Sequence, residues 1–310
     1  MLRRSGHRRA GFTLVEMLVV IGIIVVLVGL LLPAVMKVTD AGEKTENRAR
    51  LLAINTAMGA VKGNSAFGNP KYIPAGSYDA ATKTSGPFRL RNSYGAAGTG
   101  TATNPDVNSF EARYIIAMFN VQVDPSTGIA DLGYRDAGGN PNLNIDLDAN
   151  QTLTFFLGGI PEVDPSGQTA AFTGFSTNPQ TPFKKRTSAD EPRKTSGIDL
   201  GGQSGKKQKY VLSNGFARMV DPYGTPYAYF AAYNGLANKY FGHNTDAVFG
   251  GVQAYHSGDP ATTPFENPSG YQLISAGKDR TFGTTGNMKS IPRVGEDDVT
   301  NIIEKALGSQ

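Results

Sequence analysis

The sequence contains no cysteine among its 310 residues, so neither disulfide bonds nor thiol chemistry is open to this chain. Histidine is scarce as well, and its three copies, His7, His243 and His256, lie far apart along the chain. They predict neither a metal cluster nor a catalytic triad, and no nucleophile stands beside a plausible base. These absences argue against an enzyme.

Excess positive charge is missing from everything except the N-terminus. The formal net charge of +4 matches the four arginines Arg3, Arg4, Arg8 and Arg9; without these four of the 30 basic residues, 26 remain against 26 acidic residues. The net charge therefore belongs to a short tail, and no nucleic-acid partner is expected from it.

Charge of either sign is absent from residues 17–36, which are mainly β-branched and aliphatic. As a helix this run is about 30 Å long, enough to cross the hydrocarbon core of a bilayer. The arginines before it predict a cytoplasmic N-terminus, with everything after Lys37 across the membrane. A buried core helix and a secretory signal are the alternatives, but the run lacks a polar face and continues without a small-residue cleavage site.

Glu16 is an acidic residue at the start of this apolar run. A charged side chain costs about 2.5–3.5 kcal/mol at the centre of a membrane helix and less near its edge. An intramembrane carboxylate is therefore a functional hypothesis that needs a partner. The alternative is an interfacial carboxylate that reaches the lipid headgroups.

The stretch "GFTLVEMLVVIGIIVVLVGLLLP" resembles the class III signal of type IV prepilins and pseudopilins. The resemblance identifies residues 1–11 as a leader that ends at Gly11, Phe12 as the first mature residue, Glu16 as the fifth, and Pro33 as a helix-bending proline. It implies that a prepilin peptidase cuts after Gly11 and methylates the amine of Phe12. In a filament of identical copies, Glu16 of one subunit would then pair with the Phe12 amine of its neighbour.

After the apolar run the chain turns polar but keeps a helical pattern. Residues 12–36 are assigned to the transmembrane and filament-core helix, and residues 37–62 to its amphipathic continuation. Four apolar residues recur there at spacings of three, four and three, the period of a helix that buries one face. We expect these residues, Leu51, Ile54, Met58 and Val61, to pack against a C-terminal sheet.

Residues 63–209 are rich in Gly, Ser, Thr, Asn and Pro and are interpreted as a loop-rich variable insertion. Within them, residues 110–123 have a mixed apolar pattern that fits either a helix or a strand. Residues 148–161 predict a short helix capped by Asp148 and closed by Gly158 and Gly159. The remainder indicates long loops over a modest core, or insertions into a smaller fold.

Residues 210–310 are interpreted as a C-terminal β-sheet module. "KYVLSNG", "TPYAYFAAYNG" and "GYQLISAG" predict short strands of a small antiparallel sheet, and Pro222 and Gly224 predict a turn. The predicted fold class is α+β: a long N-terminal helix, whose first half spans the membrane, packs on this sheet, with the large loop-rich insertion between them.

The same module resembles the major pseudopilin of type II secretion systems. Residues 221–227 match an Asp-Pro-aromatic-Gly-x-Pro-Tyr turn, residues 271–279 match a Tyr-x-Leu-x-Ser-x-Gly-x-Asp segment, and an acidic pair follows. The resemblance implies a structural calcium ion held by Asp297 and Asp298, with Asp279 as a further candidate, since calcium takes oxygen ligands. Solvated surface acids are the alternative.

These resemblances predict a structural subunit of a type II secretion pseudopilus. It would be a single-pass protein of the bacterial inner membrane, with a periplasmic C-terminal domain, before it joins the filament. The expected partners are the prepilin peptidase, further copies of the chain, minor pseudopilins and the inner-membrane assembly platform. A type IV pilin for adhesion, twitching or DNA uptake, and a membrane-tethered binding protein that never polymerises, are the alternatives.

Overall fold

The computed structural model describes residues 13–68, 70–79, 84–101, 105–136, 138–163, 170–201, 208–233, 236–237, 239–289 and 297–302. The chain divides into two compact units, Met1–Glu46 and Asn47–Gln310. We call the second unit the head. Each unit is described by itself.

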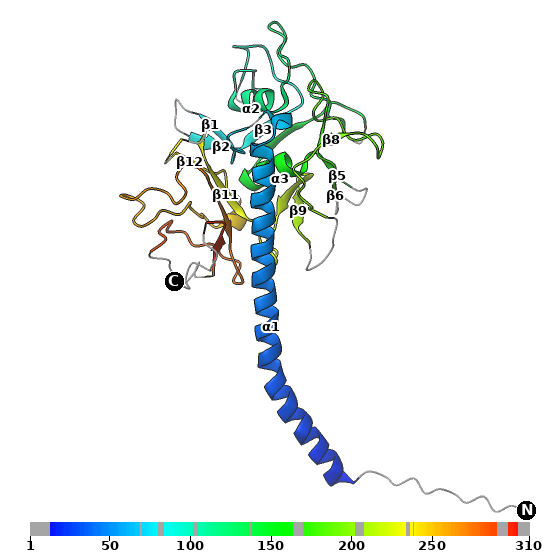
Figure 1. The fold of residues 1–310 in the computed structure, drawn as a ribbon, viewed down its shortest axis with the longest axis vertical. Helices are drawn as coiled ribbons and strands as arrows, with labels where there is room; N and C mark the ends of the chain where they lie inside the picture. Colours follow the sequence, from blue (N-terminus) through cyan, green and yellow to red (C-terminus); the bar gives the residue numbers. More distant parts are fainter. Residues whose placement is uncertain are drawn as a thin grey trace, which may run out of the picture. The chain divides into compact units, whose positions relative to one another are not determined.

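The helix α1 runs without interruption over Leu14–Lys62 and so contributes to both units. Pro33 lies inside it and does not end it, although proline lacks the N–H that would bond to the carbonyl of Gly29. Figure 1 shows α1 curving within its N-terminal part, the part that holds this proline. A proline is one of the few recognised causes of such bending.

The last four turns of α1 belong to the head and bury one face there. Leu51, Ile54, Met58 and Val61 are all buried in the hydrophobic core. The spacing of these residues predicted this face, and the prediction is confirmed. The helix ends at Lys62, and Asn64 caps the short 3₁₀ helix η1 (Ser65–Phe67) that follows.

Two further helices lie in the middle of the sequence. The ambiguous segment forms α2, Phe110–Phe119, whose first turn is capped by the Ser109 side chain. The predicted short helix forms α3, Ala149–Gly158, and Asp148 caps it through a capping box with Gln151. Both backbone N–H groups that the box satisfies would otherwise have no partner at a helix start. A second 3₁₀ helix, η4, spans Ala247–Phe249.

The strands of the head are short and pair in antiparallel fashion. Among the described residues, one sheet has four strands in the order β12-β11-β13-β14, and five two-stranded ladders pair β1 with β2, β3 with β4, β5 with β6, β7 with β8 and β9 with β10. Their bounds are β1 Ser77–Asp79, β2 Thr84–Gly86, β3 Phe88–Arg91, β4 Asn144–Leu147, β5 Pro161–Val163, β6 Ala170–Phe172, β7 Phe175–Ser176, β8 Arg193–Lys194, β9 Tyr210–Ser213, β10 Phe216–Met219, β11 Ala228–Ala232, β12 Tyr240–Phe241, β13 Tyr271–Ser275 and β14 Val299–Thr300.

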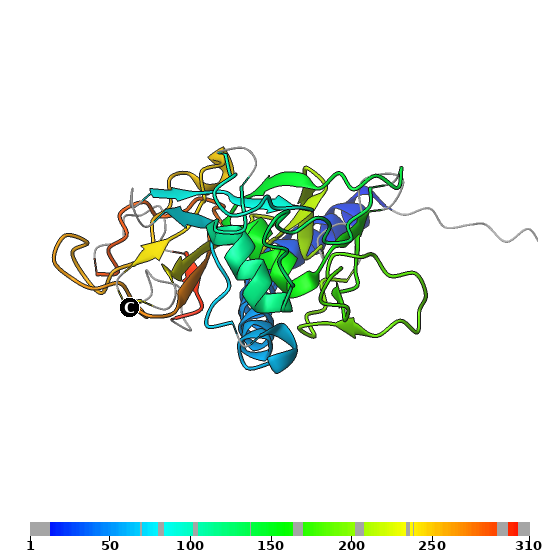
Figure 2. The same ribbon diagram turned by 90° about the horizontal axis from the view of Figure 1, so that it is seen from above.

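This arrangement confirms the predicted α+β class, and the three segments expected as strands after residue 209 are strands. They do not share one sheet as predicted, because β9 pairs with β10 in a ladder of its own, whereas β11 and β13 lie in the four-stranded sheet. The four-stranded sheet lies on one side of α3, and the ladders β5–β6 and β7–β8 lie on the other (Figures 1 and 2). All ten residues of α3 are buried. A helix that is buried on every side is the centre of a core rather than a cover for it.

The core around α3 is larger than the loop-rich composition of residues 63–209 suggested. An aromatic cluster joins the rings of Phe119, Phe155, Phe175 and Phe183, whose centroids lie 4.8–6.2 Å apart. These four phenylalanines come from this middle segment, and they share one hydrophobic cluster with α1 and with the C-terminal strands. The segment therefore builds much of the core of the head.

The turn at residues 221–227 forms as its proline and glycine predict. The Gly224 N–H donates to the Asp221 carbonyl at 3.0 Å, and Val220 forms a bridge with Pro226. Gly224 has a φ of +89°, which a residue with a Cβ rarely adopts. The turn carries the chain from β10 into β11.

Candidate processing and assembly site

The start of α1 holds Glu16 in a local hydrogen-bonded ring with Thr13. The Thr13 backbone N–H and hydroxyl each donate to Glu16 Oε2 at 2.8 Å, and the Glu16 N–H donates to Thr13 Oγ1 at 3.2 Å. This reciprocal pattern is a capping box. The carboxylate at the start of the apolar run thus accepts hydrogen bonds from its own chain, at the first helical turn.

Sequence reasoning identified Glu16 but missed Thr13. The signal was present, because a threonine three residues before a glutamate, ahead of an apolar run, is the sequence signature of a capping box. Gly11 and Phe12, the predicted cleavage point and amine, lie outside the residues that the structure describes. The cut between them and the pairing of Glu16 remain predictions.

The surface of α1 that follows Glu16 is apolar and uncovered. Every residue from 13 to 39 is exposed, including large side chains such as Leu14, Ile21 and Leu30. Adding a Cβ at Gly22 or Gly29 would meet no atom within 4 Å. Within the described part of the chain, α1 is the one helix long and apolar enough to cross a membrane. Such a surface suits lipid or the same helix of another copy.

The three predicted calcium ligands lie near one another at the C-terminal end of β13 and the start of β14. The Asp279 N–H donates to Asp297 Oδ2 at 3.0 Å. Asp298 is fully buried, and its Oδ2 accepts hydrogen bonds from the Tyr255 hydroxyl at 2.8 Å and from the Gly283 N–H at 2.9 Å. The backbone around Gly277 packs tightly on Asp297, because an added Cβ would lie 2.4 Å from the Asp297 carbonyl.

Asp298 is the acidic side chain in this group that lacks a hydrogen bond at one carboxylate oxygen. Its Oδ1 is buried and has no hydrogen-bond partner. Burial raises the pKa of Asp298 to about 7, and the neighbouring charges of Asp297 and Asp279 add to the shift. A cation beside Oδ1 would supply the missing interaction. However, no three Asp, Glu or His side chains among the described residues gather so as to hold a metal ion, so backbone oxygens would have to complete a site.

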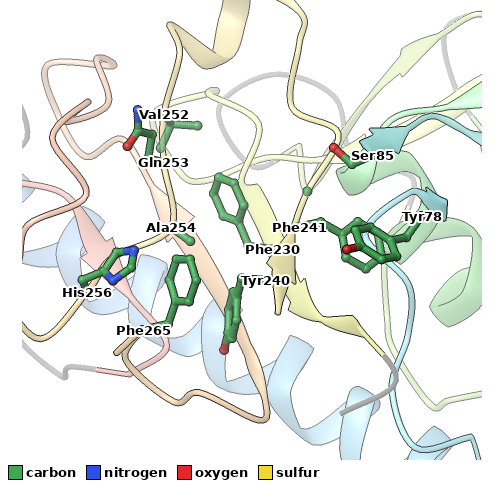
Figure 3. Close-up of a pocket in the computed structure, with 11 residues that line it drawn as sticks. Tyr78, Ser85, Phe230, Tyr240, Phe241, Val252, Gln253, Ala254, His256 and Phe265 are labelled. Carbon is green, nitrogen blue, oxygen red and sulfur yellow. The ribbon is translucent and has the colours of Figure 1, made fainter. Parts of the chain in front are cut away.

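A cavity of about 330 Å³ with aromatic walls opens on the head beside β12 (Figure 3). Tyr240 stacks on Phe265 with ring centroids 4.8 Å apart, and the His256 ring centroid lies 3.8 Å from that of Phe265. His256 Nδ1 lies 2.7 Å from the Thr263 carbonyl, which can only accept, so this nitrogen carries a proton. The exposed Gln253 adds a polar group to the rim.

Sequence reasoning did not find this cavity. Tyr78 and Ser85 come from the middle segment, whereas the other lining residues come from beyond residue 229. Such separated residues carry no local pattern that would bring them together. Cavities of this size with aromatic walls and a few polar groups accept small molecules or single protruding side chains.

Comparison with known proteins gives one match. Residues 6–32 match a family model described as the prokaryotic N-terminal methylation motif, and no curated protein and no solved structure matches significantly. The motif implies processing by a prepilin peptidase and polymerisation into filaments, and the proteins that carry it are generally structural. Together with the apolar start of α1, which the matched residues overlap, the motif supports a place for this chain among the type IV pilin-like proteins, the group of pilins and pseudopilins.

Proposed function

We propose that this chain is the structural subunit of a type II secretion pseudopilus. Prepilin peptidase cuts it between Gly11 and Phe12 and methylates the new amine, and the mature chain polymerises through α1 to drive protein secretion. The methylation motif at residues 6–32, continuous with the uncovered apolar surface of α1, is the observation that carries the proposal. Minor pseudopilins and the inner-membrane assembly platform are its further partners.

Glu16, together with Thr13, provides the charged group through which neighbouring subunits would interact in this assembly. In the single chain the Glu16 carboxylate accepts both hydrogen bonds from Thr13. When subunits stack, the carboxylate exchanges or shares these bonds with the positive Phe12 amine of a neighbour. A charge pair in a low-dielectric surrounding needs good geometry to offset its desolvation. The pair therefore selects one axial register between neighbouring helices.

The orientation in the membrane follows from the N-terminal arginines. They hold residues 1–11 on the cytoplasmic side of the bacterial inner membrane, so the head lies in the periplasm before assembly. Two features favour a secretion pseudopilus over a type IV pilin: the turn at residues 221–227, and the lack of cysteine to close a C-terminal loop. No nucleic acid takes part.

Co-expression with a prepilin peptidase tests the proposal. We expect a mature chain that begins at a methylated Phe12, by mass spectrometry, and filaments of this chain in electron micrographs. Deleting the gene from its own organism should abolish protein secretion. Loss of twitching, adhesion or DNA uptake with secretion intact would instead assign the filament to the pilus branch.

A second function has one observation in its favour, the aromatic-walled cavity beside β12. A membrane-tethered binding protein would use this cavity, keep the methylation motif for processing and remain unpolymerised. A chain that is correctly cut at Phe12 yet stays monomeric at high concentration would favour this function over the filament.

A structural calcium ion at Asp298 is part of the proposed function. The buried Oδ1 of Asp298 without a partner supports it, with Asp297 and Asp279 as neighbouring acids. Calcium binds about six to eight oxygen ligands, and backbone carbonyls can be among them. The ion would screen the carboxylates from one another and would hold strand β14 against the rest of the head.

Chelation is expected to lower the thermal unfolding midpoint of the full chain in detergent. An ion present at about 100 times its Kd stabilises by roughly 2.7 kcal/mol, which corresponds to a shift on the order of 5–10 °C. Asp298→Asn should abolish the response to calcium, whereas Asp124→Asn, in an exposed turn, should keep it. A midpoint of the wild-type chain that is the same in calcium and in chelator would remove the site.

A further inference from the structure

Four polar side chains from three parts of the head meet at Asn47, the first residue of α1 that belongs to the head. Asn47 of α1 is 1% exposed, and it uses both ends of its amide. Its Nδ2 donates to Ser275 Oγ at 2.9 Å, and its Oδ1 accepts from the Tyr227 hydroxyl at 2.8 Å. The Ser275 hydroxyl in turn donates to Asp221 Oδ2 at 2.7 Å. We call these four residues the Asn47 node.

Each hydrogen bond of the Asn47 node has a defined donor and a defined acceptor, so each position requires a particular type of side chain. The proton of the Ser275 hydroxyl goes to Asp221, so Ser275 Oγ can only accept from residue 47. Asp221 Oδ1 is already held by the N–H groups of Tyr223 and Thr225. Position 47 must therefore donate to one neighbour and accept from another, which a side-chain amide does and a carboxylate does not.

The next turn of α1 binds the same part of the head. Arg50 donates to the Val220 carbonyl and to the Gln208 carbonyl, both at 2.9 Å. Burial raises the pKa of the Asp221 carboxyl, and the hydrogen bond from Ser275 and the charge of Arg50 oppose that shift. Two successive turns of the helix thus hold the segment that leads into the turn at residues 221–227.

The apolar face of α1 does not by itself exclude every displacement of the helix along its own axis. A shift by three residues, with Ile54, Ala57 and Val61 as the new occupants, would keep apolar side chains at three of the four positions of this face. The same shift would bring Arg50 to the place of Asn47, and a guanidinium donates hydrogen bonds but cannot accept one. The buried groups of the node would then lack partners, at about 1–3 kcal/mol each.

We propose that the Asn47 node is the register lock of α1: within the head, it fixes the part of the helix from Asn47 to Lys62 at one rotation and one axial position against the strands. The turn at residues 221–227 supplies Asp221 and Tyr227 to this lock, which gives the motif a role beyond turning the chain. A buried asparagine sets register in coiled coils by the same physics. The lock is a property of the single chain, and only its consequence, equally placed heads along a filament, rests on the proposed function.

Distance measurements between two spin labels test the lock directly. The chain has no cysteine, so Leu52→Cys on the exposed side of α1 and Thr262→Cys in an exposed loop of the head provide unique labelling sites. The full chain in detergent should give one narrow distance distribution. With Asn47→Asp added, the distribution should broaden and gain a second component, because the helix then also occupies a position displaced along its axis by about 5 Å, the rise of one helical turn.

The matched control is Asn55→Asp, the same substitution two turns further along α1. Asn55 only accepts, from the Tyr271 hydroxyl at 2.8 Å, among the contacts that the structure gives it, and an aspartate keeps an acceptor there. We expect the control to retain the narrow distribution. A folded Asn47→Asp chain with the wild-type distribution would overturn the lock, whether or not the chain forms filaments.

Ser275→Ala provides a second variant if Asn47→Asp does not fold. It removes the acceptor for Asn47 and the donor for Asp221 without adding a charge. The same second component is expected, and its absence would overturn the proposal equally. Filament formation is read separately, so a chain with a working lock and no filaments would contradict the proposed function alone.

Discussion

Replacing Gly11 with valine is expected to leave the precursor uncut, with Met1 still at its N-terminus in place of Phe12. A Cβ at this position prevents the close approach of the backbone to a protease that glycine permits. Because misplacing a reacting bond by about 1 Å costs on the order of 10²-fold in rate, processing should fall at least that far. An immunoblot that separates precursor from mature chain, followed by N-terminal sequencing, measures it.

Gly22→Val is the matched control. Gly22 lies in α1 with open space around its Cα, so the same substitution there changes the membrane helix without touching the cut. It should be processed like the wild type. Mature chain of normal size from the Gly11 variant would refute the assignment of residues 1–11 as a leader, and with it the processing step of the proposed function.

Glu16→Gln is expected to be cut normally and to assemble almost no filament. The substitution keeps the size of the side chain and an acceptor for Thr13, but it removes the charge that would pair with the Phe12 amine. Leaving one member of a buried charge pair alone costs about 3–5 kcal/mol, which is a factor of roughly 150 to 4,000 at each contact between subunits. Sedimentation of filaments and electron microscopy provide the measurement.

Glu43→Gln serves as the control because Glu43 lies on the same helix, beyond the apolar run. It should assemble as the wild type does. If Glu16→Gln forms normal filaments, the pairing with Phe12 has no part in assembly, although the leader and its cleavage would stand.

Much of the first helix could be predicted because its signals are local. The uncharged run, the position of Glu16 and the apolar spacing from Leu51 to Val61 each depend on residues a few positions apart. The same holds for the cap that Asp148 provides to α3. Thr13 was overlooked although its signature lies three residues from Glu16, so that omission lay in the interpretation and not in the sequence.

The middle segment shows where local patterns fail. Residues 110–119 have a mixed apolar pattern, and the folded chain adds the cap at Ser109 and the burial of Ala112, Ile115, Met118 and Phe119 in the hydrophobic core. The phenylalanine cluster around Phe155 joins residues that are separated by loops of polar composition. Composition describes what a segment contains and not how much of it becomes buried.

By itself the sequence determined the apolar helix, the basic cluster before it, the methylation motif and the α+β class, since these rest on charge, hydropathy and short-range spacing. Only the tertiary structure decided which side chains the 221–227 turn and the serine of β13 contact. Asn47 meets Ser275 across 228 positions and Tyr227 across 180. Hydrogen bonds between such distant residues leave no periodic trace in a sequence, because their geometry exists only after the core has brought the helix and the sheet together.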